Sequence, residues 1–446
     1  MVGSDKILNP KTGRYVARNG AIGIQIIENN ILTKTTKNAM PVKKTASKHK
    51  TPTFTKVPLK FRIEKKQVRS VKQQTINKKI TVELLLKKLD DPTFINDFKN
   101  SLVKLVAYKK QLYIKPEMLP QPLKNKTPWI PNPNPYSTML TQIIEIEKFL
   151  DSESANAKIK LNLMSAITNS KFGMKSLVGR QSELDYIAGL LFAFSRNCRI
   201  FTRVFMNFSI FGGAGLGKSA LAKVISFVFK KSFILLRGNI VMGTSQELVS
   251  NFVGETAQKT RTQLFDALEG ILFIDEAYSL TPCQDETSKS GEYGLEAIAE
   301  LINFMDKTIG LMVIMVAGYE DKMTRCFFTS NEGLNRRFPY TFNLKPYSSI
   351  DLTKILINSM LGSEIQMSEP IYNLIYSIIS DINDNFPDLL KNQAGDMTNL
   401  SNSIIQSIYM SIEHDWNASF NSQQKIILDA FQTFLSQKGF NLSFDD

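Results

Sequence analysis

The spacing of hydrophobic residues divides the chain into stretches of different character. Residues 81–115, which include "VELLLKKL" and "FINDFKNSLVKLVAYKKQLYI", show the three-to-four-residue period of amphipathic helices. Prolines then recur from Pro116 to Pro135, too densely for a helix or a central strand, so residues 116–138 are expected to form a semi-rigid connector. Helical periodicity returns over residues 139–174.

From about Lys175 to Leu344, short apolar segments alternate with amphipathic ones. This alternation predicts an α/β domain over residues 175–345, with a parallel sheet between helices. After Lys345 the apolar strands stop, and residues 346–446 are predicted to form a helical lid domain. Its helices are expected at "SIDLTKILINSML", "PIYNLIYSIISDIND", "LSNSIIQSIYMSIEHD" and "QQKIILDAFQTFLSQ".

The N-terminal region differs from the rest in composition and charge. Residues 1–80 are rich in Lys, Thr and Asn and poor in aromatics, so most of this region is expected to be disordered. Residues 1–150 hold 29 Lys and Arg against 10 Asp and Glu (+19), whereas residues 151–446 hold 26 against 31 (−5). Such a basic head could bind nucleic acid through residues 1–115, or it could be a solvated tail without a partner.

Bulk features narrow the class of protein. A chain of 446 residues is too long for one ordinary domain. No apolar run approaches the roughly 20 residues that span a bilayer, and the start lacks the apolar segment of a secretory signal. Three scattered cysteines are too few for a disulfide framework and indicate a reducing compartment, so we expect an intracellular, cytoplasmic protein without a membrane segment. With His49 and His414 as the only histidines, no His-based metal cluster or triad can form.

One glycine-rich segment has the spacing of a phosphate-binding loop. In "FSIFGGAGLGKSALAKVISFVF", the pattern Gly-x-x-x-x-Gly-Lys-Ser follows an apolar strand and opens a helix, which is the context this motif requires. Backbone N–H groups of such a loop can surround phosphate oxygens, and the helix dipole favours the negative charge. The residues predicted to bind nucleotide here are Gly212, Gly213, Ala214, Gly215, Leu216, Gly217, Lys218, Ser219 and Ala220.

A second segment supplies carboxylates for the same chemistry. The apolar run of residues 271–274 in "GILFIDEAYSL" ends in Asp275 and Glu276, at the sheet edge where ligands of α/β proteins bind. Asp275 and the Ser219 hydroxyl are expected to hold Mg²⁺, and Glu276 to polarise the attacking water. Taken alone, two acids after a strand could be a solvated strand end. Together with Lys218 they predict an enzyme, an ATPase with ATP and Mg²⁺ as cofactors.

Four segments together resemble a known family. "FVGETAQKT", "GILFIDEAYSL", "VIMVAGYEDKM" and "NEGLNRRF" are similar to the AAA+ ATPases of the group that contains red-type Rubisco activases and bacterial sporulation ATPases. The resemblance covers about residues 175–410. It implies a homo-oligomeric ring, usually a hexamer, with ATP bound between neighbouring subunits and a protein substrate remodelled at a central pore.

The resemblance also implies roles for residues around the nucleotide. Val178 and Gly179, in "LVGR", would lie beside the adenine, although the segment could equally be an ordinary turn before a helix. Arg337 matches the arginine finger, with Arg336 beside it, although two arginines in a solvated loop would read the same way. Tyr319 stands at the sensor 1 position.

At sensor 2, "GDMT" replaces the usual "GNAR", so Thr398 stands where the family has an arginine. A contact from the lid to the γ-phosphate would then be lost, which puts the coupling of hydrolysis to lid motion in doubt.

Two further segments suggest partners. Phe252, Val253 and Gly254 match the first pore loop of the family, which grips the substrate, whereas a Phe beside a Val is also typical of a core residue at a helix end. "NPKTGRYVARNG" is similar to a short N-P-x-T-G-R element of large DNA virus proteins, which suggests a viral source and a location in the host cytoplasm or virion; alternatively it is a basic turn.

Three functional hypotheses follow. The favoured one is an ATP-driven protein remodeller, because the α/β half resembles such machines. The second is a nucleic-acid-associated ATPase tethered through its basic N-terminal region. The third is a structural subunit that binds ATP and hydrolyses it poorly, which the substitution at Thr398 would explain.

Overall fold

The computed structural model describes residues 80–121, 135–250, 252, 254–281, 290–361, 367–410 and 419–440, together with two short strands near the N-terminus. The chain divides into two compact units, Met1–Thr75 and Ile76–Asp446. In the first unit, β1 (Lys6–Leu8) pairs antiparallel with β2 (Tyr15–Ala17), on either side of the "NPKTGR" segment. The other residues before position 80, and the disorder predicted for them, lie outside the described residues.

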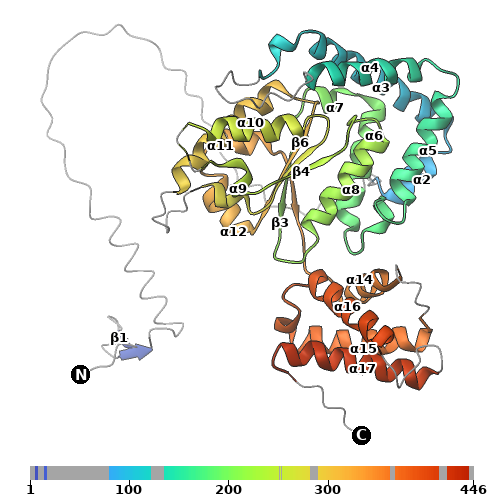
Figure 1. The fold of residues 1–446 in the computed structure, drawn as a ribbon, viewed down its shortest axis with the longest axis vertical. Coiled ribbons are helices and arrows are strands. Elements are labelled where there is room, and N and C mark those ends of the chain that lie inside the picture. Colours follow the sequence, from blue (N-terminus) through green and yellow to red (C-terminus); the bar gives the residue numbers. More distant parts are fainter. Residues whose placement is uncertain are drawn as a thin grey trace, which may run out of the picture. The chain divides into compact units, whose positions relative to one another are not determined.

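A five-stranded parallel sheet forms the centre of the second unit (Figure 1). Its order is β4 (Ile240–Gly243), β5 (Ile271–Ile274), β6 (Val313–Gly318), β3 (Phe208–Phe211) and β7 (Tyr340–Asn343). Every residue of the three inner strands is buried, as their continuous apolar sequences predict for strands covered on both faces. The predicted α/β fold class is confirmed.

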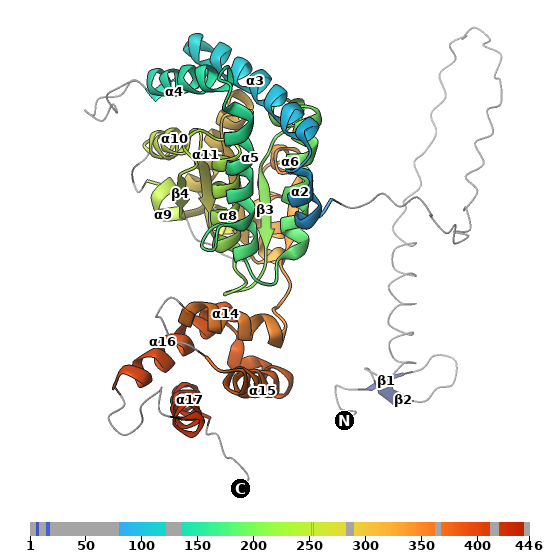
Figure 2. The same cartoon turned by 90° about the vertical axis from the view of Figure 1, so that its right-hand side faces the viewer.

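Helices cover both faces of this sheet (Figures 1 and 2). The helices of this domain among the described residues are α6 (Gln181–Arg196), α7 (Arg199–Thr202), α8 (Lys218–Lys231), α9 (Ser245–Leu248), α10 (Thr256–Asp266), α11 (Ser290–Lys307), α12 (Glu320–Lys322) and α13 (Gly333–Arg337).

The C-terminal region is helical, as predicted. It consists of α14 (Ser349–Leu361), α15 (Glu369–Asn385), α16 (Ala394–Met410) and α17 (Phe420–Gln437). Apolar residues such as Leu352, Ile379 and Phe431 are fully buried.

The N-terminal helical segments contain more breaks than their periodicity predicts. Residues 81–115 form α2 (Val82–Lys88) and α3 (Pro92–Ile114), because Asp91 caps α3 by accepting a hydrogen bond from the Thr93 N–H at 3.0 Å. The second stretch is likewise two helices, α4 (Pro135–Leu150) and α5 (Ala155–Thr168). Helix α4 begins inside the predicted connector, since proline is tolerated in the first turn of a helix.

The N-terminal helices pack directly on the α/β domain. Helix α3 lies against α6 and α5 lies against α8 (Figure 2). Lys109 of α3 is fully buried, and its ammonium group donates to Glu269 Oε2 at 2.5 Å and to the Ile234 carbonyl at 2.8 Å. Tyr113 donates to the other oxygen of Glu269 at 2.8 Å. Burial lowers the pKa of Lys109, and the Glu269 charge opposes this shift.

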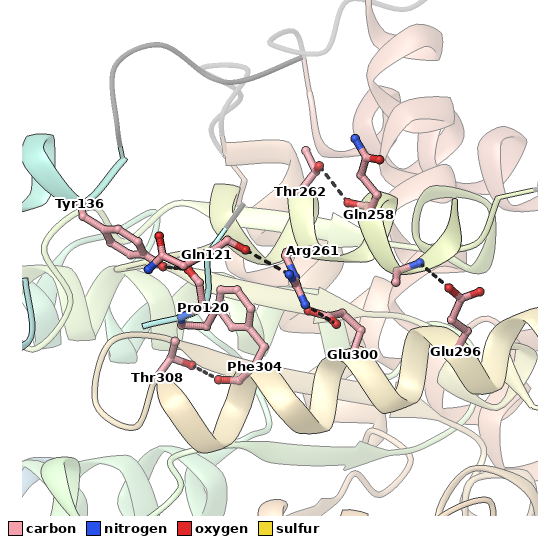
Figure 3. Close-up of polar contacts among 11 residues, drawn as sticks. Pro120, Gln121, Tyr136, Gln258, Arg261, Thr262, Glu296, Glu300, Phe304 and Thr308 are labelled. Carbon is pink, nitrogen blue, oxygen red and sulfur yellow. Dashed lines mark hydrogen bonds and ion pairs between the residues drawn. The ribbon is translucent and has the colours of Figure 1, made fainter. Parts of the chain in front are cut away.

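A second attachment joins the end of this N-terminal segment to α10 and α11 (Figure 3). Arg261 of α10 donates to both carboxylate oxygens of Glu300 of α11, at 2.6 and 2.8 Å, and to the Gln121 carbonyl at 3.0 Å. Beside it the Tyr136 ring, whose hydroxyl donates to the Pro120 carbonyl, packs edge-on against Phe265 of α10. Residues 80–121 and α4 are therefore integral to the same compact unit as the α/β domain.

Two features of the residues that the structure describes bear on the environment of the chain. No helix there is long and apolar enough to cross a membrane. Cys198 is buried and free, whereas Cys326 is disulfide-bonded, so the low cysteine count did not exclude a cross-link. The reducing compartment remains an expectation.

Candidate active site

The phosphate-binding loop joins β3 to α8, as its sequence predicts. Gly215 and Gly217 adopt left-handed backbone angles, with φ of +67° and +80°, which side chains beyond glycine rarely tolerate. A Cβ on Gly217 would also approach the Tyr347 hydroxyl to 2.6 Å. The Lys218 ammonium donates to the Gly212 and Gly213 carbonyls at 3.0 and 2.8 Å, which holds it over the loop. The first turn of α8 follows at once, so its positive dipole end faces the loop.

The acidic pair lies at the same edge of the sheet. Strands β5 and β3 flank β6 and all three are parallel, so their carboxyl ends meet. Asp275 is half-buried and accepts a hydrogen bond from the Glu276 N–H at 3.0 Å. Glu276 is exposed and has a left-handed φ of +48°, a conformation uncommon outside glycine. Its side chain thus stands clear of the buried strand.

One pocket of about 450 Å³ brings these groups together. It is lined by Ala214, Gly215, Leu216, Gly217, Lys218, Ser219, Ala220, Asp275, Glu276, Gly318, Tyr319, Ala394, Gly395 and Thr398. Gly212 and Gly213, which were also predicted to bind nucleotide, lie between β3 and these residues and do not line the pocket. Val178 and Gly179 do not line the pocket; Gly179, with φ of +68°, lies against the Tyr347 ring instead.

The lid contributes directly to this pocket. The Ala394 N–H donates to the Gly215 carbonyl at 3.2 Å, so the start of α16 touches the phosphate-binding loop. The Thr398 hydroxyl donates to the Ala394 carbonyl at 2.9 Å, within its own helix. Thr398 therefore reaches the pocket wall, but its short side chain bonds to the helix backbone, consistent with the lost sensor 2 contact.

Tyr278 does not line the pocket but interacts with Glu276, and sequence reasoning did not single it out. Burial, followed by the charge of Glu276 and a hydrogen bond to that carboxylate, raises the pKa of Tyr278 to about 12. The ring also packs against the sensor 1 region, since a Cβ on Gly318 would lie 2.9 Å from Tyr278 Cδ1. The signal in the sequence was an aromatic residue two positions after Glu276.

The structure places Arg337 differently from the expectation of an arginine free to reach a neighbour. Its side chain is buried, and the guanidinium donates to Asp306 Oδ1 at 2.9 Å, to Asp306 Oδ2 and to the Gly333 carbonyl at 2.9 Å. The adjacent Arg336 is exposed. The two adjacent arginines of α13 therefore differ in their surroundings: Arg337 is engaged with Asp306 of the same chain, whereas Arg336 faces outward.

The predicted pore-loop aromatic is exposed. Phe252 has 69% of its surface accessible, which contradicts the alternative that it is a core residue. Gly254 has φ of +80° and open space around its Cα, while Val253 lies outside the described residues. The Ser250 hydroxyl accepts from the Phe252 N–H at 3.2 Å and donates to Glu255 at 3.1 Å, which ties down the base of the loop.

The donor set fits a magnesium ion shared with a nucleotide. Ser219 and Asp275 present a hydroxyl and a carboxylate to the pocket, the hard oxygen ligands that Mg²⁺ prefers. Within the described ranges, no group of three or more His, Cys, Asp or Glu side chains could hold a metal by itself. Such a sparse set is typical of Mg²⁺ that completes its coordination with phosphate oxygens and water.

Comparison with known proteins agrees with this geometry. Residues 208–332 match the family described as "ATPase family associated with various cellular activities (AAA)". The chain contains an AAA domain. The match begins at β3 and extends past Asp275, Glu276 and Tyr319. The AAA domain is an ATPase domain, as predicted.

The relatives belong to the group that the sequence resembles. Stage V sporulation protein K of Bacillus subtilis (strain 168) is 35% identical over 160 residues, which are 35% of this chain and 47% of that protein. The chloroplastic ribulose bisphosphate carboxylase/oxygenase activase of Cyanidioschyzon merolae (strain NIES-3377 / 10D) is 36% identical over 150 residues, which are 34% of this chain and 50% of that protein. The chain thus spans about half the length of these curated relatives. The predicted resemblance is confirmed.

These comparisons do not support every earlier hypothesis. The two relatives are proteins of a bacterium and a chloroplast, and neither gives support to a viral source, a virion location or a nucleic-acid partner. A solved structure of the FIGL-1 AAA domain in complex with ADP covers 64% of this chain and 82% of its own at 14% identity, but its TM-score of 0.35 carries no argument.

Proposed function

We propose that this AAA protein hydrolyses ATP and uses the cycle to remodel a protein substrate, working as a ring of identical subunits such as a hexamer. The observation that carries the proposal is the composition of one pocket. The phosphate-binding loop, the acidic pair and the lid all line it, so a nucleotide bound there would contact all three.

Each group in the pocket has a role that suits its chemistry. Lys218 exchanges its loop carbonyls for the outer phosphates, and the loop N–H groups bind the remaining phosphate oxygens. Ser219 and Asp275 would hold Mg²⁺, which would neutralise charge on the phosphates. Glu276 orients the attacking water and accepts its proton. The charge of Glu276 contributes to the raised pKa of the neighbouring Tyr278.

The ring supplies what one subunit lacks. A permanently charged guanidinium from a neighbour stabilises charge that develops on the γ-phosphate. We assign this role to Arg336, because it is exposed, whereas Arg337 is engaged with Asp306. Val178 and Gly179 remain assigned to the adenine side of the site. Neither residue lines the phosphate pocket.

Substrate contact is assigned to the Phe252–Gly254 loop. An exposed aromatic ring offers a flat apolar surface that grips many sequences, and Gly254 lets the loop change shape. The loop leads directly into α10, whose N-terminal residue follows Glu255. If the α/β domain moves between nucleotide states, α10 would therefore transmit this movement to the Phe252–Gly254 loop and so to the bound substrate.

The nucleotide site is tested by Lys218→Ala. Loss of the ammonium group should weaken ATP binding by at least about a hundredfold and abolish turnover, because charge-assisted hydrogen bonds to two phosphates disappear. Calorimetric titration with ATP and a phosphate-release assay measure both effects. Lys223→Ala, on the exposed side of the same helix, is the matched control and should behave as wild type. Wild-type binding and turnover in Lys218→Ala would refute the site.

A further inference from the structure

Arg180 is a buried charged residue that has no role in the proposed hydrolysis mechanism. It precedes α6 and is only 3% exposed. Its guanidinium donates to the Leu216 carbonyl from Nε at 3.2 Å and from Nη2 at 2.9 Å, and to the Lys345 carbonyl from Nη1 at 2.9 Å. Leu216 belongs to the phosphate-binding loop, and Lys345 to the hinge between β7 and the lid helix α14. One rigid planar group therefore joins the loop to the hinge.

Tyr347 completes this junction. Its ring is buried and lies 3.9 Å from the Arg180 guanidinium carbon, and its hydroxyl donates to the same Leu216 carbonyl at 3.3 Å. Burial raises the pKa of Tyr347, with the Arg180 charge opposing, so the hydroxyl stays a donor at neutral pH. Cβ atoms on Gly179 and Gly217 would approach the ring or its hydroxyl to 2.8 and 2.6 Å, so both glycines leave room for it.

The same junction reaches the lid. The Tyr347 N–H donates to Gln393 Oε1 at 3.0 Å, and the next residue, Ala394, donates to the Gly215 carbonyl at 3.2 Å. Gln393 has a left-handed φ of +43°, an uncommon conformation that these contacts hold. The loop is thus bonded to the hinge through Leu216 and to the lid through Gly215.

We propose that Arg180, stacked on Tyr347, is a positioning residue that couples the phosphate-binding loop to the lid, so that nucleotide bound at the loop fixes the lid. This inference rests on the proposed nucleotide site. The Leu216 carbonyl accepts hydrogen bonds from Arg180 and Tyr347, which fixes the conformation of the loop. In this conformation the N–H groups of the loop remain free to bind phosphate. The coupling does not require the sensor 2 arginine that Thr398 replaces.

Arg180→Gln tests the coupling, with ADP as the probe. Its dissociation constant for ADP should rise at least about tenfold, because several hydrogen bonds from a charged donor are lost. Hydrogen exchange should show ADP protecting the amides of residues 392–397 in wild type and failing to protect them in Arg180→Gln at saturating ADP. Arg196→Gln, at the other end of α6, is the matched control and should match wild type in both measurements. Wild-type affinity and protection in Arg180→Gln would overturn the proposal.

Two further variants keep the test decisive if Arg180→Gln fails to fold. Tyr347→Phe removes only the hydroxyl and should weaken ADP binding about threefold. Arg180→Lys keeps the charge but cannot reach both carbonyls, so it should lose most of the lid protection. Wild-type values in both variants would overturn the coupling. Absence of ADP binding by the wild-type protein would instead refute the proposed nucleotide site itself.

Discussion

Arg336 and Arg337 are neighbours in sequence but lie in different environments. The resemblance selects Arg337, yet its guanidinium is paired with Asp306, 31 positions earlier on α11. Nothing in "GLNRRF" specifies which of two adjacent side chains faces the interior, because that depends on where α11 crosses α13. In contrast, the loop of residues 212–219 and the Asp275–Glu276 pair were predictable, since their chemistry depends on local backbone and on a strand end.

The two arginines should respond oppositely to substitution. Arg336→Ala should leave the melting temperature unchanged and lower ATP turnover by about a thousandfold or more, as expected when the charge that stabilises the γ-phosphate is removed. Arg337→Ala should lower the free energy of unfolding by about 2–4 kcal/mol, since a buried ion pair is broken but Asp306 remains half exposed to water. Thermal unfolding and phosphate release distinguish the two. Full turnover in Arg336→Ala would remove it from the site.

At the scale of elements, helix α3 shows what periodicity predicts and what it leaves open. The apolar spacing of residues 92–114 correctly indicates a helix. It does not indicate that Lys109 is buried, because lysine normally marks the solvent face, and the partner Glu269 lies 160 positions away. The breaks at residues 89–91 and 151–154 were missed because capping and turn contacts override the period. Likewise, the hydrogen bonds of Arg180 to the loop and the hinge join segments that no sequence spacing connects.

The attachment of α3 to the core can be measured. Lys109→Met should lower the free energy of unfolding by about 3–5 kcal/mol, because Glu269 is left buried without its cation. Lys110→Met is the matched control: its pair with Glu147 is about one-third exposed and should contribute under about 1 kcal/mol. Chemical denaturation of the full chain measures both. Equal effects of the two substitutions would show that the N-terminal helices are not held by the buried pair.

At the scale of the whole molecule, the proposed mechanism requires a second copy of the chain to complete the site. The pocket holds the phosphate-binding loop, the acidic pair and the lid of one subunit, while the proposed Arg336 contact comes from a neighbour. The AAA match covers residues 208–332, and helices α2–α5 add a packed layer that lies outside it. Through Arg261 and Tyr136 this layer holds α10, the helix after the pore loop (Figure 3). The ring, its substrate and the partner of the basic head are therefore proposals that depend on turnover at this pocket.

The most direct measurement is ATP turnover by Glu276→Gln. The substitution keeps the shape and hydrogen-bonding capacity of the side chain but removes the carboxylate that accepts the proton of the attacking water. The account predicts ATP binding within about twofold of wild type and phosphate release lowered by about a hundredfold or more. Glu320→Gln, an exposed acid just beyond Tyr319, should behave as wild type in the same assay. Wild-type phosphate release by Glu276→Gln would contradict the account.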